Sequence, residues 1–294
     1  MSIQKHFLYR YSCSDNFLSV FRFLFFIGLI FPVYYSILPK GQFYSFGIFQ
    51  WLNIRYINPE QFICIKYFVI ISAFFSAIGL FTRLFIFLTA VSLFLFVGAI
   101  YGYLYSPLNN YLPSDFNLTF LVTMILLFTR NIDHLTIFNF YKKDKVASND
   151  SEFINTRIFI IMAMGLVYLM AFIAKAKADL WWINGAENLK LYFFEFGMFR
   201  QSSALVGLSK QDFLMKAAWI CLMFFEAFAI LGFFIKRFRW AFIIFGIIFH
   251  WMTYQLLSID YISKYIWIYL IFIDWDKLVS GLVKIRTKVF NESN

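Results

Sequence analysis

The stretch IFIIMAMGLVYLMAFIAKAKADLWWINGAENL, residues 158–189, joins an apolar run long enough to cross a bilayer to a charged end. Lys175, Lys177 and Asp179 stand where the apolar run finishes. Charged side chains at bilayer depth cost several kcal/mol, so membrane proteins keep them mainly where they pair, anchor or react. The stretch therefore predicts a transmembrane helix whose charged end is a candidate functional site.

The composition of the whole chain is that of a polytopic membrane protein. Of its 294 residues, 62% are hydrophobic, 23% aromatic and only 14% charged, far from the balance of a soluble domain. The net charge of +10 comes from Lys and Arg residues scattered between apolar runs, without the basic stripe of a nucleic-acid-binding surface. We therefore expect the lipid bilayer as a partner and no nucleic acid.

The apolar runs predict an all-α membrane helix bundle of about eight spans. They begin near Phe17, Phe62, Leu84, Phe116, Ile158, Phe213, Trp240 and Tyr261. The runs from Phe116 and Tyr261 are short, which leaves open a tilted, partly buried or re-entrant segment at either place. We expect one integral membrane domain, residues 1–294, with an N-terminal cytoplasmic segment 1–16, a cytoplasmic linker 140–156, an outer interfacial segment 186–212 and a cytoplasmic tail 277–294.

The basic residues predict the orientation of these spans. Short cytoplasmic loops are enriched in Lys and Arg, and eight spans place most basic residues on one side, so we expect both termini in the cytoplasm. Arg22 is expected to snorkel from the first span to the nearer interface. The first span carries no small-residue cleavage site and is expected to be retained. The basic residues of the predicted cytoplasmic side are Lys5, Arg10, Arg83, Arg130, Lys142, Lys143, Lys145, Arg157, Lys236, Arg237, Arg239, Lys277, Lys284, Arg286 and Lys288.

The two lysines at the end of the opening stretch have different expected partners. Lys175 precedes Asp179 by one helical turn, so these two side chains can pair. Lys177 has no acid at helical spacing and lies near Trp181, which predicts a cation–π contact in a poorly solvated site. A lysine that is neutral part of the time can act as a general base. The alternative is that both lysines anchor at the headgroups beside Trp181 and Trp182.

Asn184 and Gly185 predict a left-handed residue that ends this helix. Residues 187–199 then follow as an aromatic interfacial helix or a re-entrant loop. The five basic residues from Lys175 to Lys210 break the charge pattern of the outer side, which indicates either chemistry or lipid contact.

A second polar cluster comprises His250, Thr253, Gln255 and Ser258 in FHWMTYQLLSID. His250 lies well inside an apolar run, and an intramembrane imidazole predicts a site. The alternative is a core histidine that donates to a neighbouring carbonyl.

Two further sets of polar residues have open interpretations. Glu226 is a third intramembrane charge, which can partner His250, Lys177 or Arg22 or be protonated in lipid. The triplet Asn109, Asn110 and Tyr111 supplies hydrogen-bonding groups on the predicted outer side, although such residues also mark ordinary turns.

Other site classes have no support in the sequence. Cys13, Cys64 and Cys221 lack any CxxC spacing, so neither a disulfide framework nor a thiolate metal site is predicted. The three histidines do not form a metal-ligand motif, and no phosphate-binding loop or nucleophile elbow occurs. We predict no metal site.

Two sequence blocks resemble blocks of the vitamin K-dependent γ-glutamyl carboxylases. In the first, IAKAKADLWWINGAENL, lysines precede Trp-x-x-Gly, and matching Trp182 and Gly185 places Lys177 on the catalytic lysine. The second, FHWMTYQLLSI, is similar to Phe-His-x-Met-x-x-Gln-Leu-x-Ser-Ile. The span pattern resembles the horizontally transferred transmembrane domain family, which includes these carboxylases and bacterial relatives, one of which helps mature a sporulation-delaying peptide toxin.

The resemblance implies a reduced naphthoquinone that is deprotonated by the lysine, reacts with oxygen and becomes a base strong enough to remove a glutamyl γ-proton before carbon dioxide adds. The protein would contribute desolvation and positioning. Two departures argue against true glutamyl carboxylation. The Asn-Asn-His pattern of the family reads Asn109-Asn110-Tyr111 here, and we expect no counterpart of the lumenal domain that engages the protein substrate.

Three functions follow as hypotheses. The first is a quinol-dependent enzyme of the bacterial cytoplasmic membrane, which modifies a small or secreted peptide on the extracytoplasmic side. The second is a noncatalytic factor for peptide maturation or export, with a membrane-associated accessory protein and residues 191–199 as docking surface. The third is a lipid-contacting scaffold. For the enzyme, the candidate catalytic residues are Lys177, His250 and Lys175, and the candidate substrate- or quinone-binding residues are Asn109, Asn110, Tyr111, Trp181, Trp182, Gln255 and Glu226.

Overall fold

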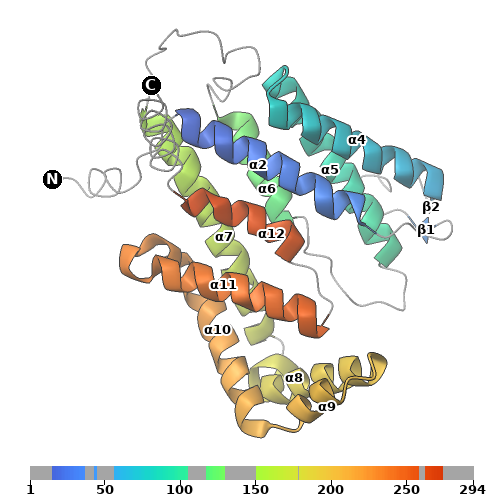
Figure 1. The fold of residues 1–294 in the computed structure, drawn as a ribbon, viewed down its shortest axis with the longest axis vertical. Coiled ribbons are helices and arrows are strands. Elements are labelled where there is room, and N and C mark those ends of the chain that lie inside the picture. Colours follow the sequence, from blue (N-terminus) through green and yellow to red (C-terminus); the bar gives the residue numbers. More distant parts are fainter. Residues whose placement is uncertain are drawn as a thin grey trace, which may run out of the picture. The chain divides into compact units, whose positions relative to one another are not determined.

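The predicted all-α fold is confirmed by the computed structural model (Figure 1). The structure describes residues 15–36, 43–44, 56–104, 117–129, 150–177, 179–257 and 262–273. Within these ranges it contains ten α-helices, one 3-10 helix and a pair of two-residue strands. The chain divides into two compact units, residues 1–160 with 267–294 and residues 161–266.

The first unit is built on three long helices. Helix α2 packs on α4, α4 packs on α5, and α5 packs on the shorter α6. Strands β1 and β2 pair antiparallel, with Phe43 opposite Ile57. The elements of this unit are α2 (Asp15–Tyr34), β1 (Phe43–Tyr44), β2 (Tyr56–Ile57), α4 (Pro59–Ile78), α5 (Thr82–Leu104), α6 (Asn117–Phe128), the first part of α7 (Asp150–Lys177), the end of α12 (Ile262–Tyr269) and η3 (Leu270–Phe272).

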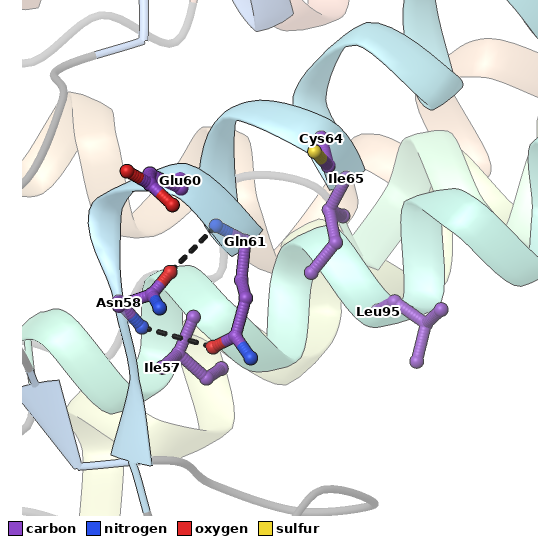
Figure 2. Close-up of a pocket in the computed structure, with 7 residues that line it drawn as sticks. All are labelled: Ile57, Asn58, Glu60, Gln61, Cys64, Ile65 and Leu95. Atoms are coloured by element: carbon purple, nitrogen blue, oxygen red, sulfur yellow. Dashed lines mark hydrogen bonds between the residues drawn. The ribbon is translucent and has the colours of Figure 1, made fainter.

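Helix α4 begins and ends with well-defined caps. Figure 2 shows how the side chain of Asn58 accepts from the Gln61 backbone N–H at 2.8 Å, while the Gln61 side chain accepts from the Asn58 N–H at 3.0 Å. These reciprocal bonds satisfy two amides that a helix start leaves open. At the other end, Gly79 adopts φ 74°, a left-handed conformation that glycine tolerates best. Local sequence therefore fixes both ends of α4.

Hydroxyl pairs join α4 to α5. Ser72 lies 3.3 Å from Ser92, and Ser76 lies 3.1 Å from Thr89, measured between their buried hydroxyl oxygens. Small residues let two helices approach closely, and their hydroxyls find partners where the bilayer offers none. At this interface α4 and α5 therefore direct their hydroxyl groups toward each other.

Two arginines of the first unit are buried, and one of them corrects a sequence prediction. Arg22 is fully buried in α2, so the expected snorkelling to an interface is wrong. Arg157 lies near the start of α7, which begins at Asp150. Its Nε donates to the carbonyl of Ile271 at 3.0 Å, and its guanidinium lies 4.3 Å from the ring centroid of Phe17. Arg157 is thus a packing residue of the first unit.

The second unit combines two apolar helices, α10 and α11, with a helical arm that consists of α8 and α9. Helix α10 packs on α11, and both contact α8, which in turn packs on α9. In Figure 1, α8 and α9 lie beside the start of α10. The elements are the rest of α7, α8 (Asp179–Phe199), α9 (Ser203–Ser209), α10 (Asp212–Phe234), α11 (Lys236–Leu257) and the start of α12.

The chain is an integral membrane protein. Five described helices are long and apolar enough to cross a bilayer: Phe17–Tyr34, Pro59–Ile78, Thr82–Ala99, Ile154–Lys177 and Asp212–Phe234. Their outer faces expose large apolar side chains, such as Phe68, Ile71 and Phe74 on α4, as lipid contact requires. All eight predicted runs are helical, although α6 has 12 residues and α12 only eight. The predicted count of eight spans remains a prediction.

Candidate functional site

An ion pair between α7 and α10 accounts for two of the predicted site residues. The Lys175 ammonium donates to both carboxylate oxygens of Glu226, at 2.6 and 2.8 Å. The Glu226 side chain is 5% exposed and that of Lys175 is 24% exposed, so the acid is the more deeply buried partner. Each charge compensates the other, which makes the burial of both tolerable.

The observed partner of Glu226 is none of the three that the sequence suggested, His250, Lys177 and Arg22. Its partner is Lys175, which was itself expected to pair with Asp179. The side chain of Asp179 lies outside the described residues. The two partners are separated by 51 positions in the chain, so the helix periodicity that suggested Asp179 could not have revealed Glu226.

A second buried pair holds His250. The hydroxyl oxygen of Tyr168 on α7 lies 2.5 Å from Nε2 of His250 on α11. Both residues are buried, and Tyr265 of α12 also packs on the imidazole, with ring centroids 5.5 Å apart. His250 therefore bonds to a tyrosine side chain, whereas the sequence suggested a backbone carbonyl as the alternative to a functional role.

Helix geometry places the two pairs on one face of α7. Tyr168 and Lys175 are seven residues apart, which is about two full turns and a rise of about 10 Å. Lys177 is nine residues beyond Tyr168, about two and a half turns, and so points to the opposite face. One face of α7 thus carries Tyr168 and Lys175, which bond to His250 and Glu226, and Lys177 is not on it.

Lys177, the predicted base, lies exposed at the end of α7. The poorly solvated site expected around its ammonium stays a prediction. The neighbouring side chains of Trp181 and Trp182, expected to shape its pocket, lie outside the described residues. The same holds for Asn109, Asn110, Tyr111 and Ser258.

The predicted break at Asn184 and Gly185 is present, but the predicted left-handed residue is not. Two helical segments of α8 meet in a kink at Asn184, whose φ of −113° and ψ of 24° are neither helical nor left-handed. A Cβ on Gly185 would lie 2.1 Å from Cε2 of Trp219 on α10. Glycine is needed here for the close approach of α8 to α10, and the predicted helix over residues 187–199 is confirmed.

Polar contacts tie the arm to the apolar helices of the second unit. Lys190 of α8 bonds to Asp212 at the start of α10 and to Glu187 one turn earlier. These hydrogen bonds, that of Asp212 first, raise the pKa of the Lys190 ammonium. Arg200 donates to the backbone carbonyl of Gln255, near the end of α11. The Gln255 side chain itself is exposed.

An apolar cavity of about 270 Å³ lies between α8, α10 and α11. Its lining includes the aromatic rings of Phe193, Phe245 and Phe249, the thiol-bearing Cys221, and Thr253. Phe249 directly precedes His250, and the Thr253 hydroxyl donates to the His250 carbonyl at 2.9 Å. The cavity is therefore walled by the same turns of α11 that carry the histidine.

No family model, curated protein or solved structure matches this chain. The site offers a tyrosine–histidine pair for hydrogen bonding or proton exchange, an ion pair that joins two helices, and an apolar cavity beside the histidine. Tyr168 is the member that the sequence analysis missed. Its seven-residue spacing from Lys175 on one helix was the available signal.

Proposed function

We propose that this protein is a membrane-embedded enzyme that uses a reduced naphthoquinone to modify a small or secreted peptide, as its resemblance to the horizontally transferred transmembrane family and to vitamin K-dependent carboxylases suggests. One observation carries the proposal: the buried Tyr168–His250 pair stands beside an apolar cavity that the same part of α11 lines. Buried titratable groups next to an apolar cavity are the usual setting of a membrane enzyme's site.

The cavity fits a flat apolar ring. Its volume of about 270 Å³ is near the lower end of ligand pockets, which span about 300–1,000 Å³. Phe193, Phe245 and Phe249 supply aromatic walls, and Thr253 supplies a hydroxyl. Bound there with oxygen, a reduced naphthoquinone would supply the oxidative chemistry that side chains cannot.

The side chains have separate tasks in this proposal. His250 exchanges a proton or polarises an oxygen of the ring compound, since its ring contacts that of Phe249, which lines the cavity. Lys175 and Glu226 neutralise each other and fix α7 against α10. Lys177 retains a proposed role as base through the resemblance alone, and Trp181, Trp182, Gln255 and the triplet from Asn109 to Tyr111 remain proposed substrate contacts.

The proposal includes the predicted topology. Eight spans, both termini in the cytoplasm and a bacterial cytoplasmic membrane would place the end of α7 on the extracytoplasmic side, where a secreted peptide is accessible. The positive charges of the predicted inner loops support this orientation.

Oxygen-dependent epoxidation of reduced naphthoquinones by purified protein in nanodiscs tests the enzyme proposal without knowledge of the peptide. We expect turnover in the wild type and loss of it in His250→Gln. Lys177→Arg separates two roles, because arginine keeps the charge but does not act as a base. Loss in Lys177→Arg would assign the base to Lys177, and full activity would assign proton exchange to His250. Folded wild type without any epoxide across several quinols would overturn the proposal.

A noncatalytic factor for peptide maturation or export is the second candidate, and one observation favours it. Leu191, Phe194 and Met198 are exposed on one face of α8, at the spacing of a helical stripe. This stripe can dock a secreted peptide or a membrane-associated accessory protein. Charged substitutions of Leu191 and Met198 should then abolish peptide maturation in cells, whereas Lys177→Ala should leave it intact.

A further inference from the structure

Tyr168 is enclosed together with His250 in an aromatic environment. Its ring lies 4.9 Å from that of Phe225 and 6.1 Å from that of Phe233, between centroids, and is stacked on the imidazole at 5.9 Å. The tyrosine is 6% exposed and the histidine 3% exposed. Water therefore has little access to the bond between the hydroxyl and Nε2.

The chemistry of the two groups selects the direction of this hydrogen bond. A neutral imidazole has one donor and one acceptor nitrogen, and its bare nitrogen is a better acceptor than a phenol oxygen. A doubly protonated ring would bring a positive charge among the phenylalanine rings, where burial without a charged partner is costly. The two atoms lie 2.5 Å apart, within hydrogen-bonding distance.

We infer that Tyr168 is the positioning residue of His250: its hydroxyl donates to Nε2 and holds the imidazole in the tautomer that carries its proton on Nδ1. The partner of one ring nitrogen determines which nitrogen is protonated. His250 is thereby prepared as a hydrogen-bond donor through Nδ1. This inference rests on the proposed function for its catalytic meaning, because there His250 polarises an oxygen or exchanges a proton. The tautomer of His250 in the resting protein does not depend on that function.

Nitrogen NMR of the histidine side chains tests this inference directly. The chain contains three histidines, so the double variant His6→Gln/His134→Gln leaves His250 as the sole labelled imidazole. In nanodiscs at neutral pH we expect a pyrrole-type signal for Nδ1 and a pyridine-type signal for Nε2. A pyrrole-type Nε2, or two pyrrole-type nitrogens, would overturn the inference.

Tyr168→Phe in the same background removes the hydroxyl and keeps the ring. We expect the single tautomer to give way to a mixture or to the Nε2-protonated form, while the exposed control Tyr67→Phe on α4 leaves both signals unchanged. An unchanged spectrum in Tyr168→Phe would contradict the inference. If that variant does not fold, the wild-type assignment of the two nitrogens still decides the question.

The NMR result and the quinol assay fail independently. A wild type with the expected tautomer but no epoxidation would retain the inference and reject the proposed enzyme. Epoxidation by a protein whose Nε2 is protonated would retain the proposed enzyme and reject the inference. If both hold, Tyr168→Phe should lower kcat at least tenfold with KM nearly unchanged, because the donor that acts in the transition state is lost while the cavity stays intact.

Discussion

Replacing Lys175 by methionine should destabilise the second unit more than replacing Glu226 by methionine. Removal of one partner from a buried ion pair typically costs about 3–5 kcal/mol, because the other charge stays buried without compensation. Without Lys175, the carboxylate is left at 5% exposure, so the free energy of unfolding should fall by about 3 kcal/mol. Without Glu226, the ammonium is left at 24% exposure, so it is less fully enclosed by protein and the loss falls to about 2 kcal/mol.

The double variant Lys175→Met/Glu226→Met completes a thermodynamic cycle. Two apolar side chains of similar volume often replace a buried ion pair at little cost, so the double variant should be more stable than Lys175→Met alone, which requires a coupling energy of more than about 2 kcal/mol. The free energy of unfolding is measurable by SDS titration in mixed micelles, followed by tryptophan fluorescence. Glu187 and Lys190 form the comparison cycle, because Glu187 is 60% exposed and this pair should show a smaller coupling than Lys175 and Glu226. Additive effects of Lys175→Met and Glu226→Met would refute the reasoning.

Three further predictions concern the fold and use thermal or detergent unfolding. Gly185→Val should separate α8 from α10 and lower stability clearly, because its Cβ would collide with Trp219, whereas Gly207→Val, where a Cβ meets nothing, should be mild. Asn58→Ala should cost about 1 kcal/mol, since it removes the cap of α4, and Asn58→Asp should retain it. The raised pKa of Lys190 predicts a contribution that is complete below its ordinary value of 10.5 and lost as pH rises through the raised value. Lys190→Met should therefore flatten the alkaline part of the stability profile, and an unchanged slope would contradict that assignment.

Much of the fold follows from the sequence because burial in a bilayer requires long apolar helices. All eight runs became helices, and α6 and α12 are short, as their sequences indicated. Asn184 and Gly185 show the limit of local patterns. The glycine was recognised as structurally required, but the reason lies in Trp219, 34 positions away in the chain, and not in a left-handed turn.

The site was harder to predict because its contacts join distant segments. Lys175, Glu226 and His250 were all identified as residues of interest, since charged or polar groups stand out in apolar runs. Their partners were not identified, because the helix periodicity that relates Lys175 to Asp179 contains no information about α10. Tyr168 was missed because one tyrosine among 18 in an aromatic-rich chain is unremarkable until α11 packs beside it.

The exposure of Lys177 changes the weight of the functional hypotheses. The Lys177 side chain is exposed and points away from the face of α7 that carries Tyr168 and Lys175. The described residues therefore do not enclose its ammonium as they would enclose a buried general base. His250, in contrast, is buried, hydrogen-bonded and adjacent to the cavity wall. The proposed enzyme therefore depends on ring binding in that cavity more than on the lysine that the resemblance selects.

Protection of Cys221 tests this binding most directly. Cys221 lines the cavity, and Cys64 is an exposed thiol of the first unit that serves as an internal control. A naphthoquinol substituted at both ring carbons that thiols attack, added anaerobically to the protein in nanodiscs, should slow maleimide labelling of Cys221 and leave that of Cys64 unchanged. Equal labelling rates with and without the quinol at both cysteines would contradict the account.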